Sequence, residues 1–463
     1  MHTETYIADD NATLISKNFR DLKKYLDMVS HGQISIPYLT RFKKVIINNA
    51  RSDFCVDEVK LLLSRGILQD AEAVEIKNPD DRFCTIDGML YSGNKQKLYL
   101  CPRGKTGNLV IHDGAELICD YACAWVRCDQ VTIPDSVKSI GENAFAFNLN
   151  LKKVEGGRNI QNIKPFAFYR CYRLKRFEFG EKLKIIGSSA FDYASLNEMK
   201  EIKFPNGLKT IGGGAFNTID IIEDKETRPV DYDQMYTVYL PETVTHIGTT
   251  AFPNASAIHM SKQTAKCLMN DYVDCLKFVQ IGLRDTNLCH NYNCNIWRLK
   301  IDGKPEVIMP KSFSCPKEAA TALRDFINTE NAPAPTMYTY NSDCAGLAAA
   351  IEHCKLYSDT KSKMFITRNI STIMYNVFHT EPDGEQFIKN RAENPIRRSD
   401  NISCQAVGWG RMRVRLYRIV SAFFYFRFRF VYFLFGLSGF SIPCSLIYSS
   451  NVSMLAPPVV DRK

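Results

Sequence analysis

The sequence lacks the short motifs that mark common enzyme active sites. It contains no G-x-S-x-G nucleophile turn, no H-E-x-x-H metal-binding helix and no G-x-G-x-x-G dinucleotide loop. Gly104-Lys105-Thr106 matches the end of a phosphate-binding loop, but Tyr99 stands where that loop requires glycine. We therefore predict no catalytic residue, no cofactor and no enzymatic activity.

The sequence also has few signs of export or metal binding. Its 16 cysteines are scattered without a paired framework, and residues 1–12 are polar and acidic, unlike a secretory signal. We expect free and mostly buried thiols in a reducing compartment. Cys289, His290 and Cys294 lie close together, but a zinc site needs a second close pair of ligands, and none is evident. We predict no metal site.

Excess positive charge is confined to one end of the chain. The sequence has 59 basic and 50 acidic residues, a net charge of +9. Residues 391–463 hold 11 Lys and Arg against 3 Asp and Glu, a net of +8, which leaves +1 for residues 1–390. A groove that follows phosphates needs cations along its length. We therefore predict no nucleic-acid partner for the body of the protein.

The basic tail, residues 401–463, runs into an uncharged apolar stretch. No charged residue lies between Phe430 and Val460, which is long enough to cross a bilayer. We predict a transmembrane segment at 430–449, and the arginines before it predict a cytoplasmic body. A strand, or a nonfunctional tail foreign to the folded protein, remains an alternative. The expected localisation is cytoplasmic, or tethered to a membrane by the C-terminus.

The middle of the chain repeats itself. A degenerate copy begins at Leu109, and clearer copies follow, starting at Val131, Val154, Phe177, Ile202 and Val238, with spacings of 23, 23, 25 and 36 residues. An acidic insertion near 223–234 accounts for the longest spacing. Nine residues after its start each clear copy has Ile (Ile140, Ile163, Ile186, Ile211, Ile247), and it then has Ala followed by Phe (Phe145, Phe168, Phe191, Phe216, Phe252).

These copies predict a solenoid. One short unit cannot bury its apolar side alone, so neighbouring units must stack around a shared core. Alternation at the start of a copy predicts a strand, with Val131 and Ile133 pointing inward. We expect Phe to fill the space between coils, Ala to allow their close approach, and the Gly after Ile to supply the backbone angles of a corner.

The pattern IP-x-S/T-V-x-x-I-G-x-x-A-F resembles the BspA-like, or treponemal-type, leucine-rich repeat family. Phe83–Gly104 resembles the hairpin that often precedes such repeats. The resemblance covers residues 83–262. It implies an elongated solenoid that binds other molecules, often in adhesion at cell surfaces. The polar start of this chain departs from the exported members.

The predicted fold class is an α/β solenoid with flanking regions. We assign 1–82 to a helical N-terminal cap, because 13–29, the segment from Pro37 and Val56–Leu63 have helical spacing. Residues 83–262 are the repeats, and 263–400 are a small α+β C-terminal region. In that region we expect a hairpin within 296–309 and helices at 317–328 and 344–356.

The outward strand positions of the repeats are the predicted binding site. Opposite charges lie two residues apart, so this face should neutralise its own charges, and tyrosines could anchor a protein partner, centred on Tyr239, Tyr169 and Tyr172. The site residues are Thr132, Lys153, Glu155, Arg176, Glu178, Glu201, Lys203 and Tyr239.

The expected function is non-enzymatic protein–protein interaction or adhesion through this face. Three alternatives remain open: a solvated face with no partner, a soluble intracellular scaffold with a nonfunctional tail, and an unrecognised enzyme within 263–400.

Overall fold

The computed structural model forms two compact units, each considered by itself. The first is Met1–Leu283 with Lys300–Lys304 and Ile327–Glu330, and the second holds the rest of the C-terminal half. The structure describes residues 4–8, 12–36, 42–50, 53–64, 66–196, 198–218, 236–283, 295–340, 344–357 and 360–366. The tail with its predicted span at 430–449, the Cys289–Cys294 cluster and the insertion near 223–234 lie outside them. In the described segments, no helix is long and apolar enough to cross a membrane.

The first unit begins with a parallel sheet and not with a helical cap. Strand β1 (Thr5–Ile7) pairs antiparallel with β2 (Thr13–Asn18), and β2, β3 (Lys44–Asn49) and β4 (Ala73–Asn78) are parallel. Helix α1 (Phe19–Ser30) links β2 to β3, while α2 (Val56–Leu63) and the short 3-10 helix η1 (Gly66–Leu68) link β3 to β4.

The helical prediction for 13–18 and for the segment after Pro37 is therefore wrong, whereas Val56–Leu63 is a helix as predicted. Val45 and Ile47 are buried in β3, where helices pack on the sheet, so the strand reads as an apolar run. Asn18 ends β2 and caps α1, because its side chain accepts a hydrogen bond from the Asp21 amide at 2.9 Å.

The hairpin expected at 83–104 is confirmed. Strands β5 (Cys84–Ile86), β6 (Met89–Tyr91) and β7 (Lys97–Leu100) are antiparallel neighbours. Strand β7 then pairs in parallel with β9 (Leu117–Ile118), so the hairpin leads directly into the repeats.

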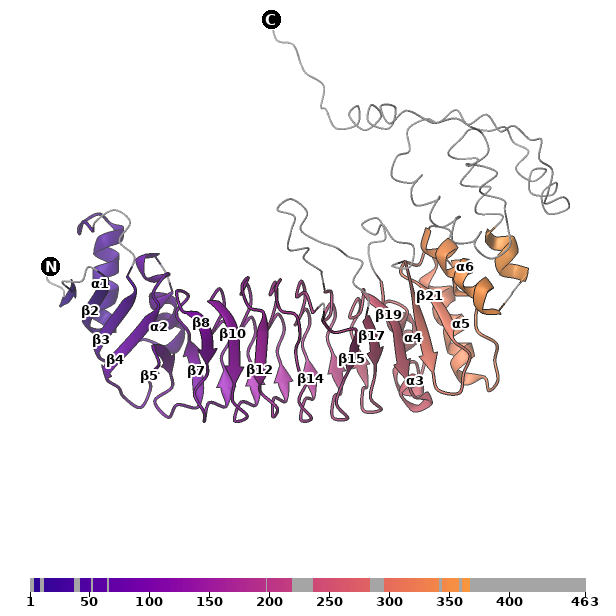
Figure 1. The fold of residues 1–463 in the computed structure, drawn as a ribbon, viewed down its shortest axis with the longest axis horizontal. Coiled ribbons are helices and arrows are strands. Elements are labelled where there is room, and N and C mark those ends of the chain that lie inside the picture. Colours follow the sequence, from indigo (N-terminus) through magenta and orange to yellow (C-terminus); the bar gives the residue numbers. More distant parts are fainter. Residues whose placement is uncertain are drawn as a thin grey trace, which may run out of the picture. The chain divides into compact units, whose positions relative to one another are not determined.

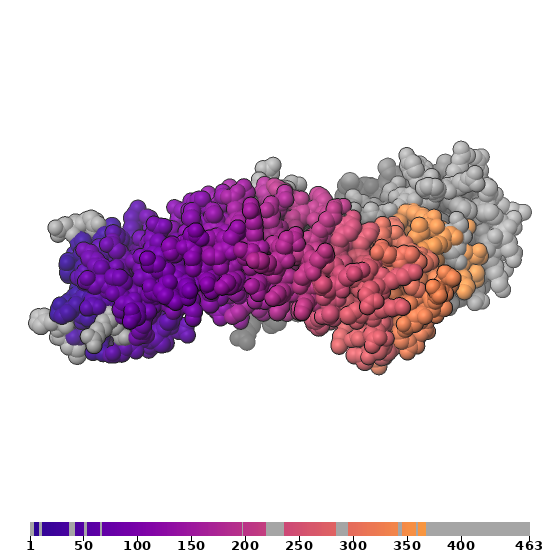
Figure 2. Space-filling model, turned by 90° about the horizontal axis from the view of Figure 1, so that it is seen from below, coloured from indigo at the N-terminus to yellow at the C-terminus, as the bar shows by residue number. Residues whose placement is uncertain are grey.

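The repeats form a solenoid whose coils follow one another along the first unit (Figures 1 and 2). The coils give short strands to two parallel ladders, except that the coil starting at Phe177 adds only an isolated bridge to the first. The first ladder contains β8 (Thr106–Val110), β10 (Arg127–Ile133), β12 (Lys153–Gly156), β15 (Glu201–Lys203), β17 (Tyr236–Tyr239) and β19 (Ala255–Met260). The second contains β9, β11 (Ser139–Ile140), β13 (Asn162–Ile163), β14 (Ile185–Ile186), β16 (Thr210–Ile211) and β18 (His246–Ile247).

The repeated Ile and Phe side chains build the core, as predicted. The five Phe rings from Phe145 to Phe252 are fully buried and stack nearly parallel, with neighbouring centroids 5.2, 5.2, 5.3 and 5.5 Å apart. Burying each ring removes a large apolar area from water, which is the main force holding the coils together. In the degenerate first copy, the buried Cys123 takes the place of Phe.

The glycines after Ile serve close approach rather than unusual backbone angles, which corrects the prediction. A Cβ on Gly187 would lie 2.3 Å from the nitrogen of Pro165, and one on Gly212 would lie 2.2 Å from the nitrogen of Ser188. Neither glycine has a positive φ. The neighbouring coil therefore occupies the space that any side chain would need.

Two helices follow the last coil. These are α3 (Lys262–Leu268) and α4 (Tyr272–Phe278). Just after α4, the carbonyls of Gln280 and Ile281 accept hydrogen bonds from the amides of Thr250 and Phe252, both at 2.9 Å. These bonds satisfy amides of the final coil that have no further coil to pair with.

The second unit contains the hairpin and helices expected after residue 295. Strands β20 (Ile296–Ile301) and β21 (Val307–Pro310) are antiparallel, and α5 (Pro316–Asn328), the 3-10 helix η4 (Met337–Tyr340) and α6 (Cys344–Tyr357) follow. Its core joins the hairpin to α6 through Ile296, Ile308, Tyr338, Leu347 and Ile351.

Candidate functional site

The predicted site residues lie in register on the first ladder of strands. Lys153 pairs with Gln130 and Arg176, and Thr132 pairs with Glu155. Further along, Glu201 and Lys203 pair with Thr237 and Tyr239. Every one of these predicted side chains is exposed or half-buried. The structure therefore places the predicted set on one side of the solenoid, in one group that ends with Glu178 in the coil of Phe177 and a second group that begins at Glu201.

A hollow of about 490 Å³ lies where these two groups meet. The first ladder is interrupted between the coil of Phe177 and strand β15. Four of its lining residues, Arg176, Glu178, Glu201 and Lys203, belong to the predicted site, and the ring of Phe179 is half-buried in it. The remaining lining residues are Phe177, Glu198, Met199 and Lys200. Charged side chains thus surround an apolar floor, an arrangement typical of binding pockets.

The prediction that this face neutralises its own charges is confirmed. Glu155 forms an ion pair with Lys153, Arg176 lies 3.3 Å from Glu178, and Lys203 lies 2.7 Å from Glu201. The hydrogen bond and charge of Lys203 lower the pKa of Glu201. Because these pairs are exposed, they contribute little to stability.

Tyr239 is placed at the C-terminal end of the face. Its hydroxyl donates to Glu201 Oε1 at 3.2 Å, the Lys203 ammonium lies 5.1 Å from the ring centroid, and the ring stacks on His259 at 4.6 Å. Tyr169 does not join it, because its ring packs among aromatic residues of the Ala-Phe turns. Of these two predicted anchor tyrosines, only Tyr239 therefore lies on the strand face.

Comparison with known proteins identifies the repeats. Residues 116–226 match the model of the BspA type leucine rich repeat region, in 6 copies. The repeats are BspA-type leucine-rich repeats. No curated protein matches the chain significantly.

Several solved structures share similarity with this BspA-type region. The pneumococcal vaccine antigen PcpA is 16% identical over 40% of this chain and 48% of its own, with a TM-score of 0.30. The T. pallidum leucine rich repeat protein is 22% identical over 39% of this chain and 84% of its own (TM-score 0.24). A Bacteroides ovatus leucine-rich repeat protein is 17% identical over 49% of this chain and 58% of its own (TM-score 0.29). The matched part thus spans about half the length of PcpA.

The sequence analysis missed a second surface of the BspA-type coils. Two residues after each Phe position, successive coils carry Trp125, Phe147, Arg170 and Tyr193, whose side chains contact one another. The signal was a large residue at this position in four copies, although the last two copies have Thr218 and Asn254 there. It was missed because that position is not occupied by one residue type, so it does not appear in a consensus.

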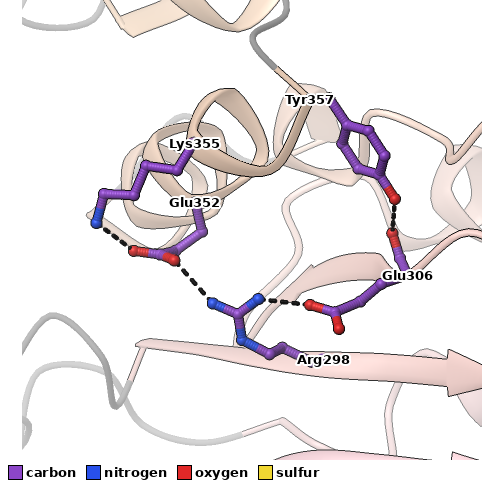
Figure 3. A network of polar contacts seen from close by, with 5 residues as sticks. All are labelled: Arg298, Glu306, Glu352, Lys355 and Tyr357. Atoms are coloured by element: carbon purple, nitrogen blue, oxygen red, sulfur yellow. Dashed lines mark hydrogen bonds and ion pairs between the residues drawn. The ribbon is translucent and has the colours of Figure 1, made fainter. Parts of the chain in front are cut away.

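The second unit holds a network of polar contacts (Figure 3). Arg298 on β20 forms ion pairs with Glu306 and, at 2.7 Å, with Glu352 on α6, and Lys355 bonds the other oxygen of Glu352 at 2.7 Å. Tyr357 donates to the Glu306 carbonyl at 2.6 Å. Burial alone would lower the pKa of Arg298. The hydrogen bonds and charges of both glutamates outweigh this effect, so the pKa of Arg298 is raised. The network joins α6 to the hairpin.

One buried cluster in this unit contains a serine and a histidine. Ser362 Oγ donates to the Tyr338 hydroxyl at 2.8 Å and lies 3.0 Å from His353 Nδ1. Both Ser362 and His353 are buried, and aromatic rings of Tyr338 and Tyr357 pack on the imidazole. These contacts describe a cluster packed in the core of this unit. Among the residues that the structure describes, no group of His, Cys, Asp and Glu could hold a metal ion.

Proposed function

We propose that this chain is a non-enzymatic interaction protein whose BspA-type repeats bind a protein partner through the first ladder of strands. Proteins with such repeats are commonly involved in protein–protein interaction or adhesion. The observation that carries the proposal is the hollow between the coil of Phe177 and strand β15, because four of the predicted residues line it.

The charge pairs around the hollow favour selectivity over general attraction. Arg176–Glu178 and Glu201–Lys203 are formed before any partner arrives, and Glu201 and Lys203 are held on a strand that pairs with β17. A partner with the opposite order of charges would meet complementary groups, while another order would meet like charges. The Phe179 ring offers the apolar contact that a protein anchor residue needs.

Exchanging the charges within pairs tests this proposal. The variant R176E/E178R/E201K/K203E keeps the net charge and lets both pairs reform, but it reverses the pattern that a partner meets. A photoreactive residue at Lys200 in the full chain would capture partners, which mass spectrometry identifies. We expect proteins captured by the parent chain to be reduced at least tenfold in the exchanged variant.

A matched exchange elsewhere on the repeats is the control. Lys138 and Glu116 also form an exposed pair, at 2.9 Å, and K138E/E116K should leave capture unchanged. Equal capture by the parent chain and by R176E/E178R/E201K/K203E would reject the strand face as the binding site.

Tethering by residues 430–449 is a separate proposal that rests on their uncharged length. Fractionation of the full chain and of residues 1–400 tests it. The tether predicts that detergent is needed to extract the full chain and not the shorter one. If both stay soluble without detergent, the tether is rejected.

A further inference from the structure

Five side chains stack in a line along the turns of the first unit. They are Arg103, which follows hairpin strand β7, and Trp125, Phe147, Arg170 and Tyr193, one from each of the first four coils, and we call them the Arg–aromatic ladder. The Arg103 guanidinium lies 4.7 Å from the Trp125 centroid, and the Trp125 and Phe147 rings are 4.9 Å apart with planes 2° from parallel. The Arg170 guanidinium lies 5.7 Å from both the Phe147 and Tyr193 centroids.

The backbone sets the ladder's register. The amides of Trp125, Phe147, Arg170 and Tyr193 each donate to the next coil, at 2.8–2.9 Å. All four residues have left-handed backbone, with φ of 60°, 61°, 57° and 59°. This conformation is unfavourable for large side chains and favours Gly or Asn. The same conformation recurs four residues earlier in each coil, at Tyr121, Asn143, Phe166 and Ser189, so it belongs to the repeated backbone geometry of the coils.

The ladder is partly exposed and borders other exposed apolar side chains. Trp125 is 41% exposed, and Tyr121, Leu149 and Phe166, from the same turns, are 48%, 52% and 36% exposed. A hollow of about 510 Å³ adjoins it, lined in part by Arg103, Trp125, Phe147 and Leu149. Contiguous exposed apolar surface of this kind marks interaction sites.

The five ladder residues include two arginines and no acidic residue. Arg103 and Arg170 belong to the ladder, and the exposed Arg173 follows in the same turn. Asp70 in the adjoining hollow is already bound to Arg127 at 2.7 Å. Asp192 lies half-buried in the turn of Tyr193, and its carboxylate accepts a hydrogen bond from Asn217 at 2.9 Å. The surface therefore favours an anionic partner.

Stacking also decides which atoms face outward. Guanidinium groups and rings cover one another's faces, so they present ring edges, which carry partial positive charge, and in-plane N–H donors. Bases of single-stranded nucleic acid bind by stacking on open aromatic faces, as do flat sugar rings. Carboxylates bind the edges of guanidinium groups in pairs of hydrogen bonds.

We propose that the Arg–aromatic ladder binds an extended acidic peptide segment of a protein partner, with two carboxylates four residues apart and apolar side chains between them. Arg103 and Arg170 are three coils apart, which is about 14 Å at the usual strand spacing of about 4.8 Å. Four residues of extended chain cover about 13–14 Å. The apolar side chains between would lie on Trp125, Phe147 and Leu149. This surface is additional to the strand face of the proposed function.

A defined peptide tests the inference. The probe is a fluorescent twelve-residue peptide with two glutamates four positions apart and leucine and valine between them, titrated with the full chain and followed by anisotropy. We expect saturable binding that weakens with salt. A control peptide with glutamine in place of both glutamates should bind at least tenfold more weakly, and the variants R103Q and R170Q should each bind the probe at least tenfold more weakly.

Two further variants separate binding from folding. F147N removes a ring while placing a favoured residue in left-handed backbone, so the chain should fold and bind the peptide more weakly. R158Q, an exposed arginine outside the ladder, should bind like the parent. No saturable binding, equal binding of the glutamine-substituted peptide, or tighter binding of heparin or oligo-dT would overturn the inference. The strand-face variant R176E/E178R/E201K/K203E should still bind the peptide, so the two proposals can fail separately.

Discussion

The α-carbon of Gly212 lies against the backbone of Ser188 in the preceding coil, so closely that an added Cβ would be 2.2 Å from its nitrogen. We expect G212A to reduce the free energy of unfolding by about 1–3 kcal/mol, since a close-packed coil contact must open. Urea unfolding followed by circular dichroism measures this. G207A is the matched control, because its Cβ would meet its nearest atom at 3.3 Å. Equal losses in both variants would contradict the close-approach explanation.

Arg298 connects two glutamates in the second unit, so its removal should destabilise that unit. R298A removes the cation that Glu306 and the nearly buried Glu352 share, while Glu352 keeps its ion pair with Lys355. Breaking such a pair from one side costs about 3–5 kcal/mol when buried, and we expect about 2–3 here because Arg298 is partly exposed. The thermal midpoint measures this. R324A, which breaks an exposed pair with Asp325, should change it little, and a similar shift in both would contradict the assignment.

Asp192 should make the stability of the first unit depend on pH. Burial raises its pKa, and hydrogen bonds from Asn217 and Ser189 oppose only part of that effect. The folded state therefore holds the proton more tightly than the unfolded state, so ionisation lowers stability as the pH rises through these values. We expect D192N to raise the thermal midpoint at pH 7 and to have little effect below about pH 4, near the unfolded carboxyl pKa.

E201Q should show the opposite sign, because Lys203 lowers the pKa of that carboxyl and favours its charged form in the folded state. Its small stabilising contribution is present at neutral pH and is lost as the pH falls. A D192N benefit that stays constant from pH 3 to 7 would show that the charge is not its cause.

The cysteines should differ sharply in reactivity. Cys55, Cys267 and Cys315 are exposed, while Cys123, Cys128 and Cys171 are buried. Burial raises the pKa of Cys128 to about 12, and it also raises that of Cys171. Thiolate is the reactive form, so brief iodoacetamide treatment at pH 8 should label the exposed three and spare the buried three. Peptide mapping checks this, and urea should remove the protection. Labelling of Cys171 in the native protein would contradict the burial of its side chain between the coils.

The sequence predicted the repeat core well because one residue type recurs at one place. Ile140 and Phe145, and their equivalents in later copies, must meet in register for the coils to share a core. The hollow near Phe177 had a weaker signal: its copy is 25 residues long rather than 23. Length alone does not show which strand loses its partner.

The N-terminal sheet was missed for a different reason. Leu14, Phe19 and Leu22 have helical spacing, yet Leu14 lies in β2 and the others in α1. A strand of six residues is too short to establish its own period beside a helix. The Arg–aromatic ladder could not be found from a consensus, because arginine and aromatic rings stack equally well while differing in residue type.

The coil stack continues unchanged across the place where the chain is lengthened. Phe216 and Phe252, on either side of residues 219–235, are 5.5 Å apart, close to the spacing of uninterrupted neighbours. Ile211 pairs with Ile247 just as Ile186 pairs with Ile211. The stacking of the core therefore does not depend on the length of the segment that joins two coils. New recognition sequences can be inserted at a corner, in nature or by protein engineering, without redesigning the scaffold that carries them.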